Sequence, residues 1–152
     1  MKKLISGLSP EDTFCLYAFV KAYENIRIED YPKDDDLFAK YPELEKLNND
    51  FLAISFGGKD NSKAIELLDI NGLKDNQMYG LRHGSPLRSF LYHLRNSIAH
   101  AYISKREDND RIIVRDKSKD KWHKLTAIGI LSSIDIINIF TNTLNLINYE
   151  EE

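Results

Sequence analysis

One helical segment constrains the fold of this chain more than any other. Ser85 and Pro86 form a typical helix start, a capping hydroxyl followed by a proline in the first turn. The pattern that follows is helical to about Tyr102. At about 100° per residue, its large apolar side chains fall on one face: Leu87, Phe90, Leu91, Leu94 and Ile98. We therefore expect this face to pack into the core of the fold.

The opposite face of the same helix is polar. It gathers arginine, asparagine and histidine with a few smaller or aromatic residues: Arg88, Ser89, Tyr92, His93, Arg95, Asn96, Ala99 and His100. Asn96 and His100 are one turn apart and share a side, and Arg95 lies about 100° from Asn96. A hydrated helix surface can have this composition too, and the physics alone slightly favours that interpretation.

The side-chain types on this face suit the cleavage of RNA. Histidine gives and takes protons near neutral pH, and arginine offers a fork of donors that matches phosphate oxygens. Asparagine can orient an imidazole or hold a hydroxyl group. Together they could support attack of an RNA 2′-hydroxyl on the neighbouring phosphate, which needs a base, an acid and charge stabilisation but no metal.

The N-terminal half of the chain has helical patterns. A helix begins at residues 9–10 and is apolar on more than one side. A second helical region begins at Asp34, is interrupted or restarted by Pro42, and ends at Gly57-Gly58. Ser62 is then a candidate cap for a short helix.

The C-terminal half adds a hairpin and a closing helix. Residues 102–106 and 111–115 contain β-branched side chains and flank a polar turn, which predicts a β-hairpin. Thr126 is expected to cap a last, apolar helix that continues to Ile147. The expected fold is all-α, a single domain over residues 1–152. It is a bundle of about five helices with one small β-hairpin inserted before the C-terminal helix.

Charge is divided unevenly along the chain. The formal net charge of −3 argues weakly against nucleic acid as a partner. Residues 82–124, however, hold 11 Lys/Arg against 5 Asp/Glu. Such a chain can bind a polyanion at one face while the other keeps it soluble. The alternative is that residues 105–124 form a solvated hairpin with no ligand.

Several classes of protein are excluded or disfavoured. No apolar stretch approaches the roughly 20 residues of a membrane-spanning helix, and the N-terminal apolar run is too short for an export signal. The single cysteine, Cys15, excludes an internal disulfide and favours a reducing compartment, so we expect a cytoplasmic protein. The histidines, His83, His93, His100 and His123, lack a second ligand cluster at a recognised spacing. We expect no metal and no cofactor.

Residues 94–102, Leu-Arg-Asn-Ser-Ile-Ala-His-Ala-Tyr, resemble the Arg-x4-His signature of the HEPN superfamily of ribonucleases. The resemblance includes the polar residue after Arg95 and the small residue before His100. It extends to the order of elements, with several helices before the motif, a short hairpin after it and an apolar helix at the end. The most similar subfamily has this hairpin insertion and is predicted to act in plasmid or phage conflict.

The resemblance implies a specific mechanism. HEPN ribonucleases are homodimers in which two signature helices meet and form one composite cleft. Arg95 would bind and stabilise the scissile phosphate, His100 would act as general base or acid, and Asn96 would position His100 or the ribose. The products would be a 2′,3′-cyclic phosphate and a 5′-hydroxyl, and no metal is implied. The alternative is a non-catalytic HEPN module for dimerisation and for binding RNA or a protein, although such modules usually lose the Arg or the His.

Further residues are candidates for contacts with RNA or for regulation. RNA-binding candidates are Arg88, Tyr92, His93, Lys105, Arg106 and Arg115. A surface role for His93 and packing of Tyr92 across a dimer remain open. Arg-x4-His-x-Tyr also resembles the motif of HEPN toxins whose antitoxin, a minimal nucleotidyltransferase, adds AMP to the tyrosine. Tyr102 is thus a candidate for modification, or it packs at the base of the hairpin. Trp122 is expected to anchor the return strand to the bundle.

Overall fold

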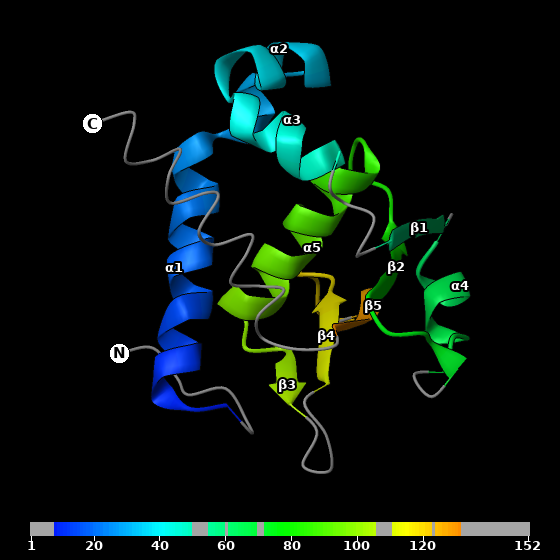
Figure 1. The fold of residues 1–152 in the computed structure, drawn as a ribbon. Helices are drawn as coiled ribbons and strands as arrows, with labels where there is room; N and C mark the ends of the chain where they lie inside the picture. Colours follow the sequence, from blue (N-terminus) through cyan, green and yellow to red (C-terminus); the bar gives the residue numbers. More distant parts are fainter. Residues whose placement is uncertain are drawn as a thin grey trace.

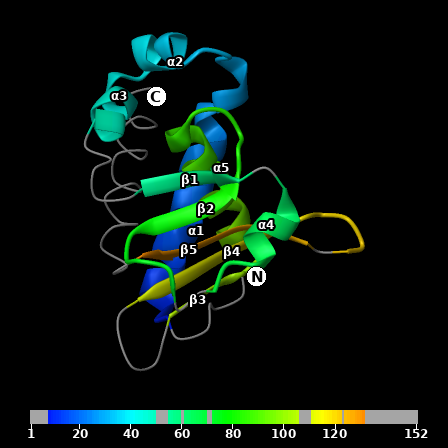
Figure 2. The same ribbon diagram turned by 90° about the vertical axis from the view of Figure 1, so that its right-hand side faces the viewer.

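The computed structural model of the chain describes residues 8–49, 55–59, 61–69, 72–105, 111–122 and 124–131. A mixed sheet forms the middle of this structure, with helices on both of its faces (Figures 1 and 2). The helices are α1 (Pro10–Ile26), the 3-10 turn η1 (Ile28–Asp30), α2 (Asp34–Lys40), α3 (Pro42–Asn49), α4 (Ser62–Glu66) and α5 (Pro86–Ala99).

The sheet has five strands in the order β1-β2-β5-β4-β3. They are β1 (Ser55–Lys59), β2 (Gln77–Leu81), β3 (Ile103–Lys105), β4 (Ile112–Lys117) and β5 (Leu125–Leu131). β1 and β2 are parallel, and every other neighbouring pair is antiparallel. β5 therefore lies in the middle of the sheet, although it comes last among these strands in the sequence.

The main core lies between the sheet and the two long helices α1 and α5. The apolar stripe expected on α5 is fully buried, with Leu87, Phe90, Leu91, Leu94 and Ile98 all at most 1% exposed. It packs against α1 and the inner face of the sheet: Leu16, Phe19, Ala22, Ile26, Met78, Ile112, Val114, Ala127 and Leu131. The prediction that this helix is a core element is confirmed.

The all-α prediction is wrong, because the chain has a mixed α/β fold. The segment expected to begin a C-terminal helix at Thr126 belongs to β5. Its side chains alternate between the α5 face, where Ala127 is buried, and the opposite face, where Ile128 and Ile130 are buried. A strand that is covered on both faces has a continuous apolar run, which resembles a buried helix in sequence. The rest of the expected helix lies outside the described residues.

The second helical region is also shorter than expected. Pro42 does restart the helix, since α2 ends at Lys40 and α3 begins at Pro42. Gly57-Gly58 is not a helix stop, however, because both glycines lie within β1 and pair with β2. The short helix at Ser62 is confirmed as α4, and its cap is Asn61, whose Oδ1 accepts from the Ala64 N–H at 3.0 Å.

Two local predictions that position the candidate site are confirmed. α5 begins at Pro86, and the Ser85 hydroxyl caps it by accepting from the Arg88 N–H. β3 and β4 form the expected antiparallel hairpin. In the described part of the chain, no helix is long and apolar enough to cross a membrane.

Candidate active site

Helix α5 ends at the last residue of the Arg-x4-His motif. His100 is the C-cap residue, and Ala101 follows with a φ of 59°, in the left-handed region. The Tyr102 N–H donates to the Ser97 carbonyl at 2.7 Å and the Ala101 N–H to the Ile98 carbonyl at 3.0 Å. This is the Schellman pattern that closes a helix and turns the chain away. It leaves Arg95 and Asn96 inside α5 and carries Tyr102 toward β3.

Arg95 is held between two neighbours. Its Nε donates to Glu24 Oε1 of α1 at 3.2 Å, and a terminal nitrogen of the guanidinium also contacts that oxygen. The other terminal nitrogen donates to Asn96 Oδ1 at 2.9 Å. The Arg95 side chain remains 26% exposed. Its guanidinium is thus fixed in direction and still open to solvent on one side.

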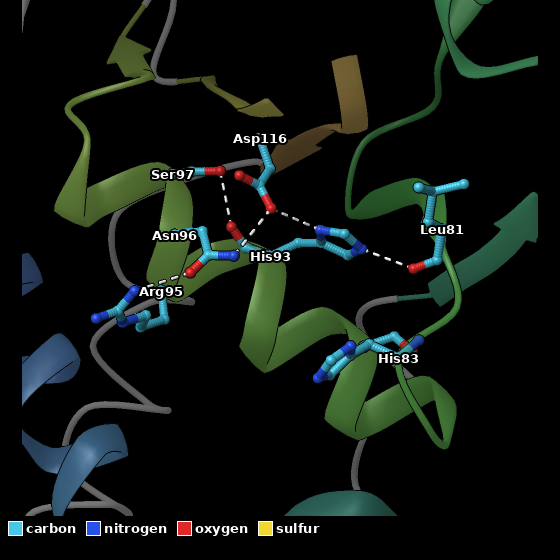
Figure 3. Close-up of polar contacts among 8 residues, drawn as sticks. Leu81, His83, His93, Arg95, Asn96, Ser97 and Asp116 are labelled. Carbon is cyan, nitrogen blue, oxygen red and sulfur yellow. Dashed lines mark hydrogen bonds and ion pairs between the residues drawn. The ribbon is translucent and has the colours of Figure 1, made fainter. Parts of the chain in front are cut away.

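Asn96 connects Arg95 to a buried pair, His93 and Asp116 (Figure 3). The Asn96 Nδ2 donates to Asp116 Oδ2 at 3.2 Å, and the same oxygen lies 2.8 Å from His93 Nδ1. Asp116 comes from β4, so this cluster ties the motif helix to the sheet. Its three polar side chains are at most 6% exposed. With its amide nitrogen committed to a carboxylate, Asn96 can only present its oxygen to Arg95.

The contacts of His93 define where the protons of this pair lie. His93 Nε2 lies 2.7 Å from the Leu81 carbonyl, which can only accept, so Nε2 carries a hydrogen (Figure 3). A second hydrogen must lie between His93 Nδ1 and the Asp116 carboxylate. His93 and Asp116 therefore form a hydrogen-bonded pair that is neutral overall, as a pair buried to this extent requires.

Gly80 of β2 provides the space in which the His93 ring lies. A Cβ at residue 80 would lie 3.1 Å from His93 Cδ2 and 2.8 Å from the Cβ of Ala127. Gly80 and Ala127 are paired in the sheet, on the face that α5 covers. His93 can therefore occupy its buried position because residue 80 has no side chain.

Two clefts open on either side of Asn96. The first, of about 290 Å³, is lined by His100 and by basic residues, and the second, of about 370 Å³, is lined by Arg95 and by acidic residues. Both are also lined by Asn96, His83, Tyr92 and Lys119. Hence the expected phosphate-binding and proton-transfer side chains do not share a single pocket in one chain, but border adjoining ones.

The two clefts differ in charge. The His100 cleft contains Arg82, Lys117 and Lys119, and its only carboxylate among the described lining residues is Asp116, which the pair with His93 neutralises. In the Arg95 cleft, Glu24 and Glu29 offset the charges of Arg95 and Lys119. A polyanion is therefore attracted mainly to the His100 side.

Aromatic residues form the wall between the clefts. The rings of His83 and Tyr92 stack, with centroids 3.7 Å apart and planes 12° apart. Burial, and then the charge of His93, lowers the pKa of His83 from its usual 6.5. Burial, followed by the nearby Glu29 carboxylate, raises the pKa of Tyr23 to about 12. Tyr23 therefore keeps its proton at neutral pH.

The polar face of α5 is less open than the helical pattern indicates. His93 is 2% exposed, and Ser89 is fully buried. The Arg88 side chain is 11% exposed, and its guanidinium is bonded to Asp34 and to the backbone carbonyls of Tyr31 and Ile28. Arg88 therefore ties α5 to η1 and to the start of α2. Tyr92, in contrast, does line both clefts.

The remaining candidates are distributed over the sheet. Lys105 lies on β3 and pairs with Ile112, on the face of the sheet that carries α5. Arg115 pairs with Ile128, on the opposite face, so β4 directs it away from Asp116 and the motif. Arg106 lies outside the described residues. The anchoring role expected for Trp122 is wrong, because its side chain is 67% exposed.

Tyr102 lies between the motif and the hairpin. Its ring is 5.9 Å from that of His100, and the ammonium group of Lys117 lies 4.9 Å from its centroid. Its carbonyl accepts from the Arg115 N–H at 3.1 Å, at the base of the hairpin. Tyr102 therefore both packs at the base of the hairpin and lies close to His100.

Sequence reasoning missed three residues that complete the site. Glu24 is 71 residues from Arg95 in the sequence, and Asp116 is 20 residues from Asn96. His83 precedes α5 and stacks on Tyr92, and no local spacing relates these three residues to the motif. The one available signal is Asp116, a carboxylate on the strand face that otherwise carries the apolar Ile112 and Val114. Across the described residues, no group of three His, Cys, Asp or Glu side chains is arranged to hold a metal ion.

Comparison with known proteins identifies the family. The family model described as HEPN pEK499 p136 matches residues 12–152, which is most of the chain. No curated protein and no solved structure matches. The predicted resemblance to the HEPN superfamily is confirmed by this match, and the chain belongs to the HEPN pEK499 p136 family.

Proposed function

We propose that this protein is a metal-independent RNA endonuclease whose active site contains Arg95, Asn96 and His100. The observation that carries the proposal is the position of Asn96. Its amide is oriented by Asp116, it orients Arg95, and it lies between the cleft of Arg95 and the cleft of His100. A phosphodiester that spans the two clefts would meet a cation and a proton-transfer group at the same time.

The proposed reaction is an internal transesterification. A general base takes the proton of the 2′-hydroxyl, and the 2′-oxygen forms a bond to phosphorus. The bond from phosphorus to the 5′-oxygen breaks, and a general acid protonates that oxygen. The products are a 2′,3′-cyclic phosphate and a 5′-hydroxyl. Arg95 stabilises the charge that develops on the phosphate oxygens, and His100 transfers a proton.

We propose that two copies of the chain form the complete site. One His100 cannot be base and acid in the same step, and a second copy supplies a second His100 and a second Arg95. HEPN domains often dimerise and bind RNA, which supports this assembly. Light scattering should give twice the chain mass, and a mass of 17.6 kDa at working concentration would contradict the dimer.

The biological role that fits this reaction is that of a growth-inhibiting toxin or a phage-defence effector. An antitoxin of the minimal nucleotidyltransferase type would then act on Tyr102, whose ring is 5.9 Å from that of His100. AMP at Tyr102 would add bulk and negative charge beside Lys117 and His100, where the substrate is proposed to bind. Growth arrest on induction of the wild type, and its absence with His100→Ala, would support this role.

A second candidate function is a non-catalytic HEPN module that dimerises and binds RNA or a protein. The observation that favours it is the ion pair of Arg95 with Glu24, which occupies the guanidinium. Glu24→Gln separates the two candidates. In an endonuclease it removes the charge that competes with phosphate for Arg95, while the bond to Asn96 Oδ1 still orients the guanidinium, and it raises cleavage by up to about fivefold, the equivalent of an exposed ion pair. In a binding module it leaves RNA intact.

The main test is incubation of single-stranded and structured RNA with purified protein in EDTA. We expect cleavage by the wild type and a loss of at least about a hundredfold in Arg95→Ala and His100→Ala. Arg27→Ala is the matched control, because Arg27 also pairs with a carboxylate, Asp30, and is 70% exposed far from the motif in sequence. Intact RNA in every sample would refute the proposed endonuclease activity. Cleavage that EDTA abolishes would refute the metal-independent mechanism.

A further inference from the structure

The turn that follows β4 combines basic residues with an exposed aromatic side chain. Lys117 ends β4, and Lys119, Lys121 and Lys124 follow it at short intervals. Trp122, the only tryptophan of the chain, is 67% exposed. A large apolar ring placed among cations on a protein surface is a recurrent arrangement for binding single-stranded nucleic acid.

The turn is held by hydrogen bonds of its own. Asp120 Oδ1 accepts from the Trp122 N–H at 2.9 Å and from the Ser118 hydroxyl at 3.0 Å. The Ser118 N–H donates to the Lys124 carbonyl at 2.8 Å, and the Ser118 Oγ accepts from the Lys124 N–H at 2.9 Å. The exposure of Trp122 therefore belongs to an ordered turn. The only carboxylate of the turn, Asp120, is committed to this structure.

The turn adjoins the cleft of His100. Lys117 and Lys119 both line that cleft, together with Arg82 and His100 itself. Trp122 follows Lys119 by three residues, so their backbones are at most about 11 Å apart. A strand of RNA with its scissile phosphate near His100 can reach the indole within a few nucleotides.

The charges of the two clefts favour one direction for an RNA strand that leaves the reaction centre. In the Arg95 cleft the carboxylates of Glu24 and Glu29 offset the charges of Arg95 and Lys119, so this cleft has no net positive charge to attract a phosphate chain. The His100 cleft contains three basic residues besides His100, and its Asp116 is neutralised by His93. An RNA strand that leaves the reacting phosphate is therefore attracted toward Lys117, Lys119 and Trp122.

We propose that Lys117, Lys119 and Trp122 form a subsite for unpaired RNA beside the reaction centre. The two lysines bind phosphates next to the scissile one, and the indole stacks on a base. A base offers its face for such stacking only when it is unpaired, so the subsite selects single-stranded RNA at this position. The ammonium of Lys121, 4.8 Å from the indole centroid, adds positive charge beside the stacked base. The choice of RNA as ligand rests on the proposed endonuclease function.

The first experiment uses Trp122 as its own reporter. A 2′-O-methyl RNA strand lacks the attacking hydroxyl, so it binds without being cleaved. We expect saturable quenching of the tryptophan emission when the strand is added, and markedly weaker binding of a duplex of the same sequence. Emission that stays unchanged while the strand demonstrably binds, or equal affinity for strand and duplex, would overturn the subsite.

The second experiment measures the affinity of variants for the same dye-labelled strand by fluorescence anisotropy. Trp122→Ala should weaken binding about tenfold, within the range known for base stacking, and Trp122→Phe should retain most of the affinity. Leu67→Ala is the matched control, since Leu67 is 77% exposed and is the C-cap residue of α4, a helix that lies on the face of the sheet opposite to α5 (Figure 2). Binding by Trp122→Ala within twofold of the wild type would contradict the stacking role.

The lysines are tested by the dependence of binding on salt. Lys117→Gln and Lys119→Gln should each lower the slope of log K against log salt concentration by about 0.7, the value for one phosphate contact with a single strand. Lys63→Gln on α4 is the control and should leave the slope unchanged, and equal slopes in all variants would overturn the phosphate contacts. Quenching without cleavage of ordinary RNA refutes the endonuclease and leaves the subsite. Cleavage of ordinary RNA together with unchanged binding by these variants refutes the subsite and leaves the endonuclease.

Discussion

The two ends of the Arg-x4-His motif lie in different surroundings, although five positions separate them. Asn96 is 6% exposed and is bonded to side chains from α5 and β4, and its neighbour Arg95 is paired with α1. His100, at the end of α5, is exposed. The Arg95 end is thus fixed by contacts with distant elements, α1 and β4, whereas the His100 end is fixed by backbone hydrogen bonds within residues 97–102. This difference fits the roles proposed for Arg95 and His100, because a phosphate-binding group needs a fixed direction and a proton-transfer group needs access to substrate.

The largest effect should come from removing the buried anchor of the first end. Asp116→Ala leaves His93 and Asn96 without their common acceptor, and we expect a loss of about 3–5 kcal/mol in the free energy of unfolding. Its counterpart at the second end, His100→Ala, should cost less than about 0.5 kcal/mol. Urea denaturation measures both. Equal costs for the two substitutions would remove the distinction between the ends.

A smaller loss should follow when the space for His93 is filled. Gly80→Ala introduces a Cβ that lies 2.8 Å from Ala127 Cβ and 3.0 Å from the Thr126 carbonyl oxygen. Overpacking of this kind costs about 1–3 kcal/mol. Gly72→Ala is the matched control, because a Cβ there meets nothing within 4 Å. If the two glycine variants unfold at the same urea concentration, the tight contact between His93 and β2 is not present in solution.

The exposed end should respond to backbone changes instead. Ala101 has a φ of 59°, which is unfavourable for a residue with a Cβ. We expect Ala101→Gly to stabilise the protein by about 1 kcal/mol. Ala99→Gly, two residues earlier and still in the helix, should destabilise it by about the same amount. Thermal or urea unfolding of the pair tests this, and two changes of the same sign would contradict the helix end described here.

The smallest effect concerns pH and the ring that lies between the clefts. Burial, and then the charge of His93, lowers the pKa of His83 below 6.5, so the unfolded chain binds this proton at a higher pH than the native protein does. The contribution of His83 to stability is therefore present above about pH 6.5 and is lost as pH falls toward the native pKa. An NMR titration should give a His83 pKa below 6.5, and His83→Gln should reduce the loss of stability on acidification. A titration midpoint above 6.5 would contradict the burial of the His83 ring described here.

Local signals in the sequence predicted the local features of the site. Ser85 and Pro86 mark the start of α5, its apolar stripe marks the core face, and the polar turn of the hairpin separates β3 from β4. Each of these depends on neighbours within a few residues. The motif residues Arg95, Asn96 and His100 could be chosen for the same reason.

Features that depend on pairing between distant segments could not be read in this way. The run from Thr126 to Leu131 is apolar because both faces of β5 are covered, and length and hydrophobicity alone do not separate such a strand from a buried helix. Asp116 has a role only because β4 lies beneath α5, and Glu24 only because α1 lies beside it. A helical wheel treats the polar face of α5 as open, whereas His93 is buried against the sheet and Ser89 is buried against the segment that follows β2.

The position of β5 has a consequence for synthesis of the protein. β5 lies between β2 and β4, so the pairs β1–β2 and β3–β4 cannot join into one sheet before residues 125–131 have left the ribosome. Until then Gly80 has no partner in Ala127, and the surface that receives His93 is incomplete. A nascent chain that already contains Arg95 and His100 would therefore lack the assembled site. The proposed endonuclease could therefore act only after β5 has been made.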